Sequence, residues 1–476
     1  MKKTSIYILS GLLALFTTAC ATKTECNKQA CQTQAKNITA TVDCSALKGK
    51  IKALNGVNFG PKISVEDAGS VFRKQFYDLN VQSVRLHDIS LQNPGLLIVD
   101  TDMVFPLFHA DAKDPKNYIF KPTDDYIKIS TKEGAKIIYR LGVSIDHSIE
   151  KYRTAMPDPK KWAEICCQII AHYNEGWANG YKMNIEHWEI WNEPECKNAS
   201  GLHTMWAGNL KQFTDFYIAT SKIIKARYPH LKIGGPAFVH THEDMHKFIK
   251  DVAAAKAPLD FISWHRYGRT VDDMVNDVRK VRGWLDASGF KKSETHFNEW
   301  HYFPIRWSDI RSAGKDKDKY YAIIQNIESG AFSTATMTAW QDEALDIANY
   351  YTFGGGNWGM VDNNGFPYKS YYPFKAFGQM VKNYPDRLAT TTSEKNAYAL
   401  AGKNNKGKMG ILVSLWKTGE NNLTIDFKNC KADLSKAKVL ICDDNKNLEP
   451  ACGVKIEGNK INLPINSKSS VVYIEL

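Results

Sequence analysis

The chain contains Ile185-Glu186-His187-Trp188-Glu189-Ile190-Trp191-Asn192-Glu193-Pro194-Glu195, and this stretch decides its fold. Its tryptophans and isoleucines favour a pleated, buried backbone, so the stretch predicts a strand. Pro194 ends the strand because it cannot donate a ladder hydrogen bond. Asn192 and Glu193 therefore stand at the end of a buried strand, where a carboxylate is costly to desolvate unless it is paired or used in chemistry.

A second strand that closes on a glutamate is predicted at Glu294-Thr295-His296-Phe297-Asn298-Glu299-Trp300. Glu193 and Glu299 are 106 residues apart (299 minus 193). One βα unit of an eight-stranded barrel takes roughly 30 residues, so the gap fits three units with some loop insertion. Both carboxylates are then expected at one mouth of a barrel. Such a pair suits glycoside hydrolysis, in which one carboxyl protonates the leaving oxygen and the other attacks the anomeric carbon or activates water.

Three motifs carry a resemblance to a known family: Trp188-Glu189-Ile190-Trp191-Asn192-Glu193-Pro194, Phe213-Thr214-Asp215-Phe216-Tyr217 and Lys232-Ile233-Gly234-Gly235-Pro236-Ala237. They are similar to family 39 of the glycoside hydrolases, which holds β-xylosidases and α-L-iduronidases within the clan of retaining (β/α)8-barrel glycosidases. The resemblance runs from about Asn55 to about Met380. It implies a retaining enzyme with Glu193 as general acid/base and Glu299 as nucleophile. The implied substrates are oligosaccharides or polysaccharides from plant, algal or host glycans.

The resemblance also implies substrate-binding residues at other strand ends. Asn192 is expected to hydrogen-bond the sugar 2-OH. Arg85 and His87 lie on a strand expected at Val81–Asp88 and have the same parity, so both face the barrel interior if either does. His87 is expected to contact substrate. For Arg85 two interpretations stand: a place beside the nucleophile and sugar, or a structural ion pair with an internal carboxylate such as Glu189.

Two further strand ends complete the expected site. His265 and Tyr267 close a strand expected at Leu259–Tyr267, where the family places a His-x-Tyr pair. Tyr267 would hydrogen-bond the nucleophile, and His265 would contact the sugar or the acid/base. Trp340 ends a strand expected at Thr336–Gln341 and resembles the sugar-stacking platform of the clan. The alternative for Trp340 is a core tryptophan.

The first 20 residues are expected to be a targeting signal rather than part of the fold. Two lysines follow Met1, and Ile6–Phe16 is an apolar run of 11 residues, too short to span a membrane. Thr17-Thr18-Ala19-Cys20 resembles the lipobox of bacterial lipoproteins. We therefore expect lipidation at Cys20 and a lipid anchor in the bacterial cell envelope, facing the periplasm or the cell surface. The alternative is an ordinary cleavable signal with an incidental cysteine.

Composition adds limits on partners. The chain is 43% apolar, with 12 Trp, 22 Tyr and 21 Phe, enough for a large core and for stacking on sugars. The formal net charge of +11 can attract acidic glycans toward the protein. The lysines are scattered along the chain, however, and this pattern indicates a solvated surface. No basic block is interleaved with aromatics, so nucleic acid is not expected as a partner. The oligomeric state stays open.

The ten cysteines show no zinc-binding spacing, so neither a metal ion nor another cofactor is expected. Cys166 and Cys167 are adjacent in a helical run and unsuited to bridging each other. Cys430, Cys442 and Cys452 are candidates for one disulfide in an oxidising compartment, and the disulfide pattern stays open.

The pattern of apolar runs and turns along the sequence divides the chain into three parts. Residues 21–48 are expected to be a tether with a first strand near Ile38–Val42, which can join the last domain. Residues 49–384 are expected to form the barrel. Residues 385–476 hold short apolar runs separated by turns, the pattern of a β-sandwich. The predicted fold class is therefore α/β, a (β/α)8 TIM barrel with a C-terminal β-sandwich domain, to which we assign a structural role; a carbohydrate-binding module is the rival.

Other functions remain possible at this level. Within the same clan the rival is an α-L-arabinofuranosidase-like enzyme. A surface glycan-binding protein on an inactive barrel is disfavoured by the glutamate pair, and an enolase-type lyase is disfavoured because carboxylates do not cluster on successive strand ends. Sugar specificity is expected in the loops at 88–125, 144–158 and 301–316. His301-Tyr302-Phe303 departs from the Asn-Thr-Ser type continuation of the family, which weakens the assignment to xylosidases.

Overall fold

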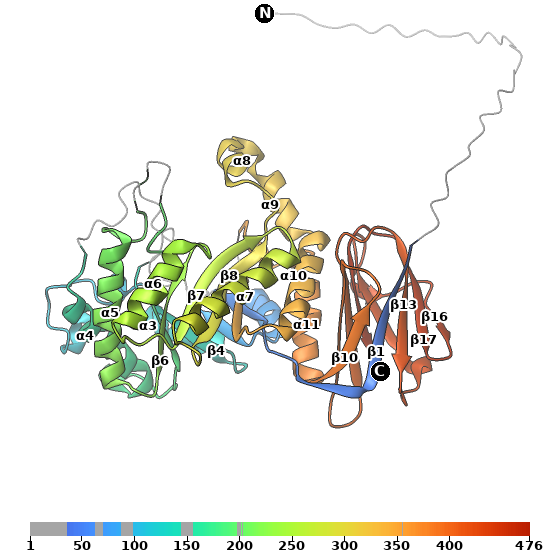
Figure 1. Ribbon diagram of the computed structural model, residues 1–476, viewed down its shortest axis with the longest axis horizontal. Coiled ribbons are helices and arrows are strands. Elements are labelled where there is room, and N and C mark those ends of the chain that lie inside the picture. The colour runs from blue at the N-terminus through green and yellow to red at the C-terminus, as the bar shows by residue number, and fades with distance from the viewer. Residues whose placement is uncertain are drawn as a thin grey trace, which may run out of the picture. The chain divides into compact units, whose positions relative to one another are not determined.

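The computed structural model describes residues 36–61, 70–86, 99–143, 156–197, 201, 203–354 and 356–476 (Figure 1). The expected signal sequence with Cys20, most of the expected tether, and His87 lie outside the described residues.

Eight parallel strands close into a barrel, which confirms the predicted (β/α)8 fold. Neighbouring strands follow chain order, and the last strand pairs with the first. The strands are β2 (Gly56–Asn58), β3 (Ser83–Arg85), β4 (Lys136–Leu141), β5 (His187–Ile190), β6 (Lys232–Phe238), β7 (Phe261–Gly268), β8 (Glu294–Tyr302) and β9 (Ile347–Tyr350). Because all strands are parallel, their carboxyl ends meet at one mouth.

Helices surround the barrel, and their ends follow ordinary capping chemistry. Asp158 caps α4 by accepting a hydrogen bond from the Lys161 backbone, and Pro159 takes the first helical position, where its missing N–H costs nothing. Asn209 and Gln212 form a capping box that begins α5. The helices are α1 (Ser70–Asp78), α2 (Thr101–Val104), α3 (Lys121–Thr131), α4 (Pro159–Asn174), α5 (Leu210–Arg227), α6 (Glu243–Ala254), α7 (Val271–Ala287), α8 (Trp307–Ser312), α9 (Lys317–Gln325), α10 (Ile327–Ala339) and α11 (Tyr371–Asn383).

The prediction of the last barrel strand was wrong. Residues 336–341 end helix α10 and enter a short 3-10 turn, and the last barrel strand is β9. Helix α10 packs on β8 and α7 on one side and on strands of the C-terminal sheet on the other, so nearly all of its side chains are buried. A helix that is buried on nearly all sides has no solvent-facing polar stripe to reveal its period, and its threonines imitate a buried strand.

Trp340 consequently belongs to the core, and its interpretation as a sugar platform was wrong. Its indole is fully buried and donates a hydrogen bond to the Met274 carbonyl at 3.1 Å. The ring packs on Phe297 and Trp300, with centroids 5.1 and 4.8 Å away. These contacts fix β8 from outside the barrel wall, where no substrate reaches.

The loop expected at 88–125 is partly regular. The described part contains α2, a 3-10 turn at Pro115–Asn117 and the start of α3. Arg140 on β4 forms an ion pair with Asp100, and the Thr101 hydroxyl accepts a hydrogen bond from the Gly142 backbone at 2.9 Å. The segment is thus fastened to the carboxyl end of β4.

The C-terminal domain is a ten-stranded sheet that folds over its own core as a β-sandwich (Figure 1). Strand β1, from the expected first-strand region, lies between β10 and β13, antiparallel to the first and parallel to the second. The strands, in sheet order, are β15 (Asn447–Pro450), β14 (Lys438–Cys442), β18 (Ser470–Glu475), β12 (Met409–Leu415), β11 (Ala397–Lys403), β10 (Asp386–Thr392), β1 (Lys36–Lys50), β13 (Asn421–Lys428), β17 (Lys460–Ile465) and β16 (Lys455–Glu457).

Polar contacts join the sandwich to the barrel. The Ser414 hydroxyl donates to the Ala331 carbonyl of α10 at 2.6 Å. Lys417 pairs with Glu328 at 3.0 Å and donates to the Tyr302 hydroxyl at 2.7 Å, at the end of β8. The sandwich thus supports the strand that carries Glu299.

The described cysteines are free thiols, and they do not form the disulfide expected among Cys430, Cys442 and Cys452. Cys442 is buried on β14, while Cys430 follows β13 in another part of the sheet order. Cys452 is exposed. None of the described helices is both long enough and apolar enough to cross a membrane.

Candidate active site

Glu193 is held at the barrel mouth by an unusual backbone conformation. It follows β5 with φ of 49°, the left-handed region that non-glycine residues seldom occupy. Its backbone N–H lies 3.2 Å from the Pro236 carbonyl and 3.0 Å from the Ala237 carbonyl, so β6 fixes the turn. Such strain persists where surrounding structure enforces it, commonly at functional sites.

His265 lies between the two predicted carboxylates. Its Nδ1 is 2.7 Å from Glu193 Oε1, and its Nε2 is 3.4 Å from Glu299 Oε1. One nitrogen of His265 and one oxygen of each glutamate all lie within 4.8 Å of one another. The Glu193 side chain is 16% exposed and the Glu299 side chain 5%, so Glu299 is the deeper group.

Arg85 connects Glu299 to a third carboxylate, Glu189. Its Nε donates to Glu189 Oε2 at 2.6 Å, and its Nη1 donates to Glu299 Oε1 at 2.8 Å. Nη1 is also 3.2 Å from Asn58 Oδ1, and Nη2 donates to Asn192 Oδ1 at 2.7 Å. The side chains of Arg85 and Glu189 are fully buried. Arg85 therefore pairs with the internal carboxylate Glu189, as one sequence interpretation expected, and it also lies beside Glu299. Its place beside a bound sugar stays a prediction.

The charges of this network leave one negative charge beside the reacting position. Burial alone would lower the pKa of Arg85, but Glu189 and Glu299 raise it above its ordinary value. Two carboxylates share one guanidinium, so Arg85 cannot neutralise Glu299 completely.

Tyr267 holds the second oxygen of Glu299. Its hydroxyl donates to Glu299 Oε2 at 2.8 Å, as the family resemblance implied. Burial and the negative charge of Glu299 raise the pKa of Tyr267 well above its usual range, so the phenol keeps its proton and remains a donor. With Arg85 on Oε1 and Tyr267 on Oε2, the Glu299 carboxylate has a fixed orientation.

Sequence reasoning missed two supporting groups. Asn298 donates to Glu189 Oε1 at 2.5 Å and thereby completes the pairing of that carboxylate. Glu195 is buried, accepts a hydrogen bond from the Val239 backbone at 2.6 Å, and has a pKa raised well above its usual range by burial. The available clue was their position, since Asn298 precedes Glu299 and Glu195 follows Glu193 by two residues.

The structure brings most of the predicted site residues together: Glu193, Glu299, Asn192, Arg85, His265 and Tyr267. Trp340 lies apart, in the core outside the barrel.

Comparison with known proteins identifies the family. The profile of glycosyl hydrolases family 39 matches residues 117–381, more than half of the chain. The chain belongs to this family.

A β-xylosidase from Geobacillus stearothermophilus is 21% identical to this family 39 protein over 294 residues, which are 55% of this chain and 56% of the relative. The chain thus matches little more than half the length of that curated relative. A glucosidase from Croceicoccus marinus superposes with a TM-score of 0.72 at 20% identity, over 93% of this chain and 99% of that one. A monomeric β-xylosidase from Caulobacter crescentus gives 0.68 at 15% identity, also over 93% and 99%. These structural likenesses establish the shared fold.

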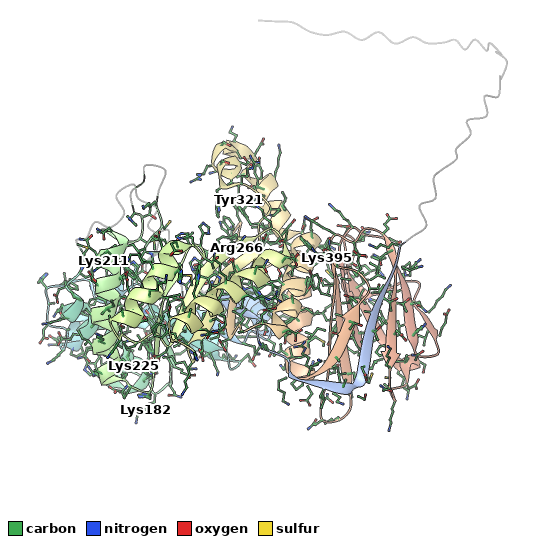
Figure 2. The ribbon with its side chains drawn as sticks, viewed as in Figure 1. Lys182, Lys211, Lys225, Arg266, Tyr321 and Lys395 are labelled. Atoms are coloured by element: carbon green, nitrogen blue, oxygen red, sulfur yellow. The ribbon has the colours of Figure 1, made fainter. Side chains whose placement is uncertain are left out.

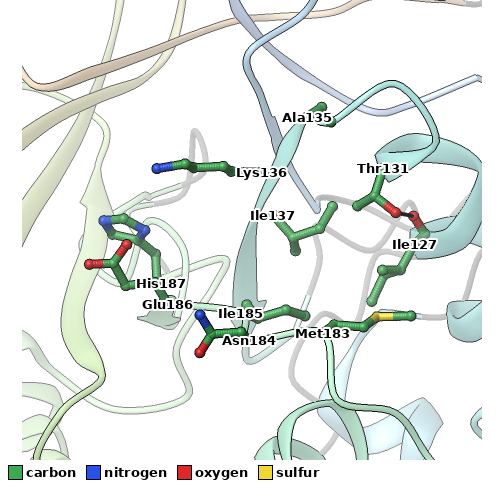
Figure 3. Close-up of a pocket in the computed structure, with 11 residues that line it drawn as sticks. Ile127, Thr131, Ala135, Lys136, Ile137, Met183, Asn184, Ile185, Glu186 and His187 are labelled. Carbon is green, nitrogen blue, oxygen red and sulfur yellow. Dashed lines mark hydrogen bonds between the residues drawn. The ribbon is translucent and has the colours of Figure 1, made fainter.

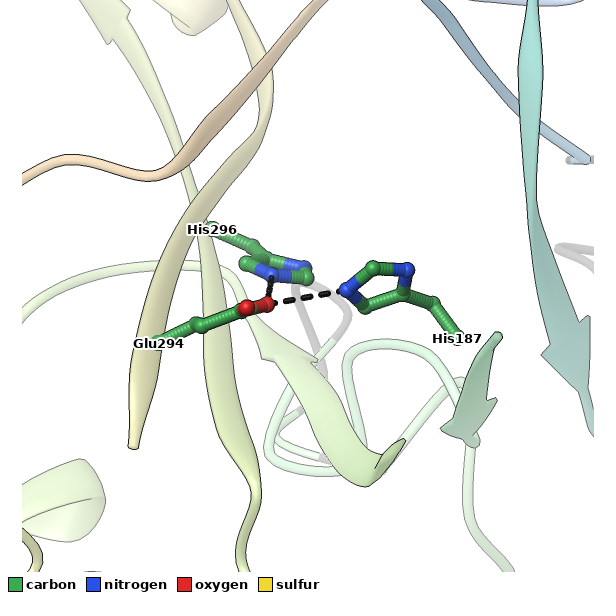
Figure 4. A group of neighbouring side chains, drawn as sticks. All are labelled: His187, Glu294 and His296. Atoms are coloured by element: carbon green, nitrogen blue, oxygen red, sulfur yellow. Dashed lines mark hydrogen bonds and ion pairs between the residues drawn. The ribbon is translucent and has the colours of Figure 1, made fainter. Parts of the chain in front are cut away.

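Another titratable group lies at the opposite end of this family 39 barrel. Glu294 Oε2 is 2.9 Å from His187 Nε2 and 3.0 Å from His296 Nε2 (Figure 4). These three side chains have metal-ligand chemistry, but Lys232 already forms an ion pair with Glu294 Oε1. Burial tends to raise the pKa of Glu294, yet hydrogen bonds from the two histidines and Lys232 hold it far below its usual range. We therefore interpret the group as an ion network that ties β5, β6 and β8 together.

A cavity of about 360 Å³ opens beside this network, at the amino ends of β4 and β5 (Figure 3). Its lining includes Lys136, Glu186 and His187. Glu193 and Glu299 are not among the lining residues, because they stand at the other mouth of the barrel.

The sharing of Arg85 yields a first prediction. Replacing Glu189 by Gln removes one carboxylate and leaves the whole Arg85 charge to act on Glu299, which favours ionised Glu299. The acidic limb of the kcat/KM profile should move to lower pH by about one unit, and kcat should fall. The measurement is hydrolysis of an aryl glycoside between acidic and neutral pH.

The matched control is Glu294→Gln, which removes a half-buried carboxylate at the far end of the barrel. It should leave the position of the acidic limb unchanged. An unchanged limb in Glu189→Gln would show that Glu189 does not tune the charge on Glu299.

Proposed function

We propose that this chain is a retaining glycoside hydrolase, with Glu193 as general acid/base and Glu299 as nucleophile. One observation carries the proposal: an oxygen of Glu193 and an oxygen of Glu299 lie within 4.8 Å of each other. Retaining enzymes hold their two carboxyl groups about 5 to 5.5 Å apart, whereas inverting enzymes leave about 6.5 to 9.5 Å for a water molecule. The separation therefore favours direct attack by Glu299 and a covalent glycosyl-enzyme intermediate.

The surroundings of Glu299 suit a nucleophile. Its oxygens are oriented by Arg85 and Tyr267, so little reorganisation is needed when it attacks the anomeric carbon. The negative charge that remains in the Arg85 network stabilises the positive charge that develops on the sugar in the transition state. Tyr267 keeps its proton and can remain a donor through the reaction.

Glu193 suits the acid/base role because it is more exposed and lies beside an ionised carboxylate. In the free enzyme Glu193 is the acid that protonates the leaving oxygen. Once Glu299 carries the sugar, Glu193 acts as the base that activates the water, which releases the sugar from Glu299. The contact from His265 holds Glu193 in place for both steps.

Asn192 is oriented to bind the sugar 2-OH. Its Oδ1 accepts from Arg85, which turns its amide N–H groups away from the guanidinium. Hydrogen bonds to the 2-OH strengthen in the transition state. Arg85 acts in this scheme by positioning Glu299 and Asn192, and His87 keeps its expected role in substrate contact.

We assign β-xylosides as the substrate class, since the curated relative is a β-xylosidase. The arabinofuranosidase-like alternative is separated from this by a panel of aryl glycosides. A non-catalytic glycan-binding role predicts no turnover of any panel member.

The N-terminal sequence gives a second prediction. We propose that Cys20 is lipidated after cleavage of the signal and anchors the enzyme in the bacterial cell envelope. Cys20→Ser should move the protein from the membrane fraction to the soluble fraction of fractionated cells. A wild-type protein that is already soluble in the periplasm would show that the segment is an ordinary signal.

A third prediction separates the two glutamates. Glu193→Ala retains the nucleophile, so an aryl glycoside with a good leaving group still glycosylates the enzyme, and turnover then stalls for lack of a base. Azide should restore turnover and yield a glycosyl azide of retained configuration. Glu299→Ala should lose about 10⁴-fold or more in kcat for good and poor leaving groups alike, since the covalent step is gone.

Product configuration, measured by NMR spectroscopy, decides the assignment. Retained azide product from Glu299→Ala together with inverted product from Glu193→Ala would reverse the two roles. Unchanged hydrolysis in both variants would place the active site elsewhere.

A further inference from the structure

A group of aromatic rings adjoins the nucleophile through Tyr267. The centroid of the Tyr267 ring lies 5.9 Å from that of Trp307 and 6.0 Å from that of Trp358. The two indoles are 5.6 Å apart at an interplanar angle of 36°, and we call them the aromatic platform. Phe303 packs on Trp307 at 4.7 Å, and Tyr321 meets Trp358 edge-on at 5.3 Å. Tyr321 belongs to α9 and is labelled in Figure 2. Phe303 and Tyr321 therefore support the two indoles of the platform.

Trp307 of the platform is open to solvent, whereas the phenylalanine that supports it is not. Trp307 is 43% exposed and is the exposed tryptophan of the described part of the chain, while Phe303 is buried. Trp358 is half-buried. Indole faces are large apolar surfaces suited to stacking, and here they lie next to the group that attacks the sugar.

The order of the barrel strands gives the direction of the substrate. Glu193 is fixed by β5, β6 and β7, whereas the platform stands on the segments that follow β8 and β9. Glu299 on β8 lies between them. The leaving group extends toward the acid that protonates it, so the sugar being transferred extends toward the platform.

We propose that Trp307 and Trp358 bind a second pyranose ring of the transferred sugar, so that the enzyme releases disaccharide units. This inference rests on the proposed function and deepens it. The ring that fits is one with equatorial substituents, such as β-linked xylose or glucose, because its axial C–H bonds form an apolar face that stacks on indole. A sugar with axial hydroxyls on that face would be rejected.

The test uses Glu193→Ala, which accumulates the covalent intermediate on Glu299. The protein is mixed with the dinitrophenyl β-glycosides of xylose and xylobiose, and of glucose and cellobiose, and its intact mass is followed. We expect the disaccharide adduct from a disaccharide probe. Adding Trp307→Ala should slow that adduct about tenfold, the effect of losing one aromatic contact, and change the monosaccharide adduct less than twofold.

Trp284→Ala is the matched control, since this half-buried tryptophan stacks on His246 of α6, away from the platform. It should change neither rate. Monosaccharide adducts alone, or equal slowing of both adducts by Trp307→Ala, would overturn the inference and leave the proposed function standing. No adduct from any probe would refute the retaining mechanism and the inference with it.

A different observation concerns two cysteines far apart in the chain. Strand β1 pairs in parallel with β13, with Asp43 opposite Lys428. Just beyond this pair, the Asn429 side chain donates to Asp43 Oδ1 at 3.1 Å and to Ser45 Oγ at 3.3 Å. Asn429 thus spans the residues on either side of Cys44 and brings Cys430 next to it.

The two cysteines belong to the same part of the sandwich. Cys44 lies in the sandwich core, and Cys430 packs against that core. Cys44 is buried, and burial followed by the contact with Cys430 raises its pKa to about 12. Cys430 is half-buried and therefore more accessible to an oxidant.

We propose that Cys44 and Cys430 form a disulfide in an oxidising compartment. The Cys430 thiolate attacks a donor disulfide and releases one donor thiol. The Cys44 thiolate then attacks the Cys430 sulfur and displaces the second donor thiol, so two protein thiols are oxidised and one disulfide is reduced. The bond would fasten β1, which follows the expected anchor, to β13.

The full chain is incubated with oxidised glutathione, digested without reductant and analysed by mass spectrometry. A peptide linked through Cys44 and Cys430 is expected, together with a melting temperature raised by about 5 °C or more. Both effects should vanish in Cys44→Ser and persist in Cys452→Ser, which removes an exposed thiol outside the pair. Bridging of Cys430 to another cysteine, or lasting glutathionylation of wild-type Cys430, would overturn the proposal.

Discussion

The guanidinium of Arg85, shared between Glu189 and Glu299, is the constraint on which the site depends. A buried arginine with one carboxylate would form a neutral pair and leave Glu299 without net negative charge. Here the third charge keeps the group negative. Because three ions buried together are costly when any partner is missing, the network also fixes the relative positions of β3, β5 and β8. The Arg85 network therefore determines the geometry at the barrel mouth and also stabilises the barrel.

Strand β8, which carries Glu299, is held from both sides. Inside the barrel Arg85 and Tyr267 orient Glu299. Outside the barrel, the core tryptophan Trp340 packs on β8. Helix α10 lies between β8 and the C-terminal sandwich, which is hydrogen-bonded to it. This arrangement gives the sandwich a mechanical role close to the chemistry, and Glu193, on a strained turn after β5, is fixed independently through β6.

The two ends of the barrel use similar residues for different purposes. At the mouth, His265 lies between carboxylates that have an accessible side. At the far end, two histidines and a lysine satisfy Glu294 completely. A carboxylate compensated on all sides stabilises the fold, whereas one that retains negative charge beside an opening can react. Residue type alone does not distinguish the two cases.

The sequence by itself determined the barrel, the β-sandwich pattern and the glutamate pair, because strand ends marked by Asn-Glu-Pro and Asn-Glu-Trp are local features. It misplaced the last strand, because a helix buried on all sides shows no amphipathic period. Only the tertiary structure showed that Glu189 shares Arg85 with Glu299, and that Trp307 adjoins Tyr267. These relations join residues whose separation in the chain is unrelated to their distance in space, so no local pattern encodes them.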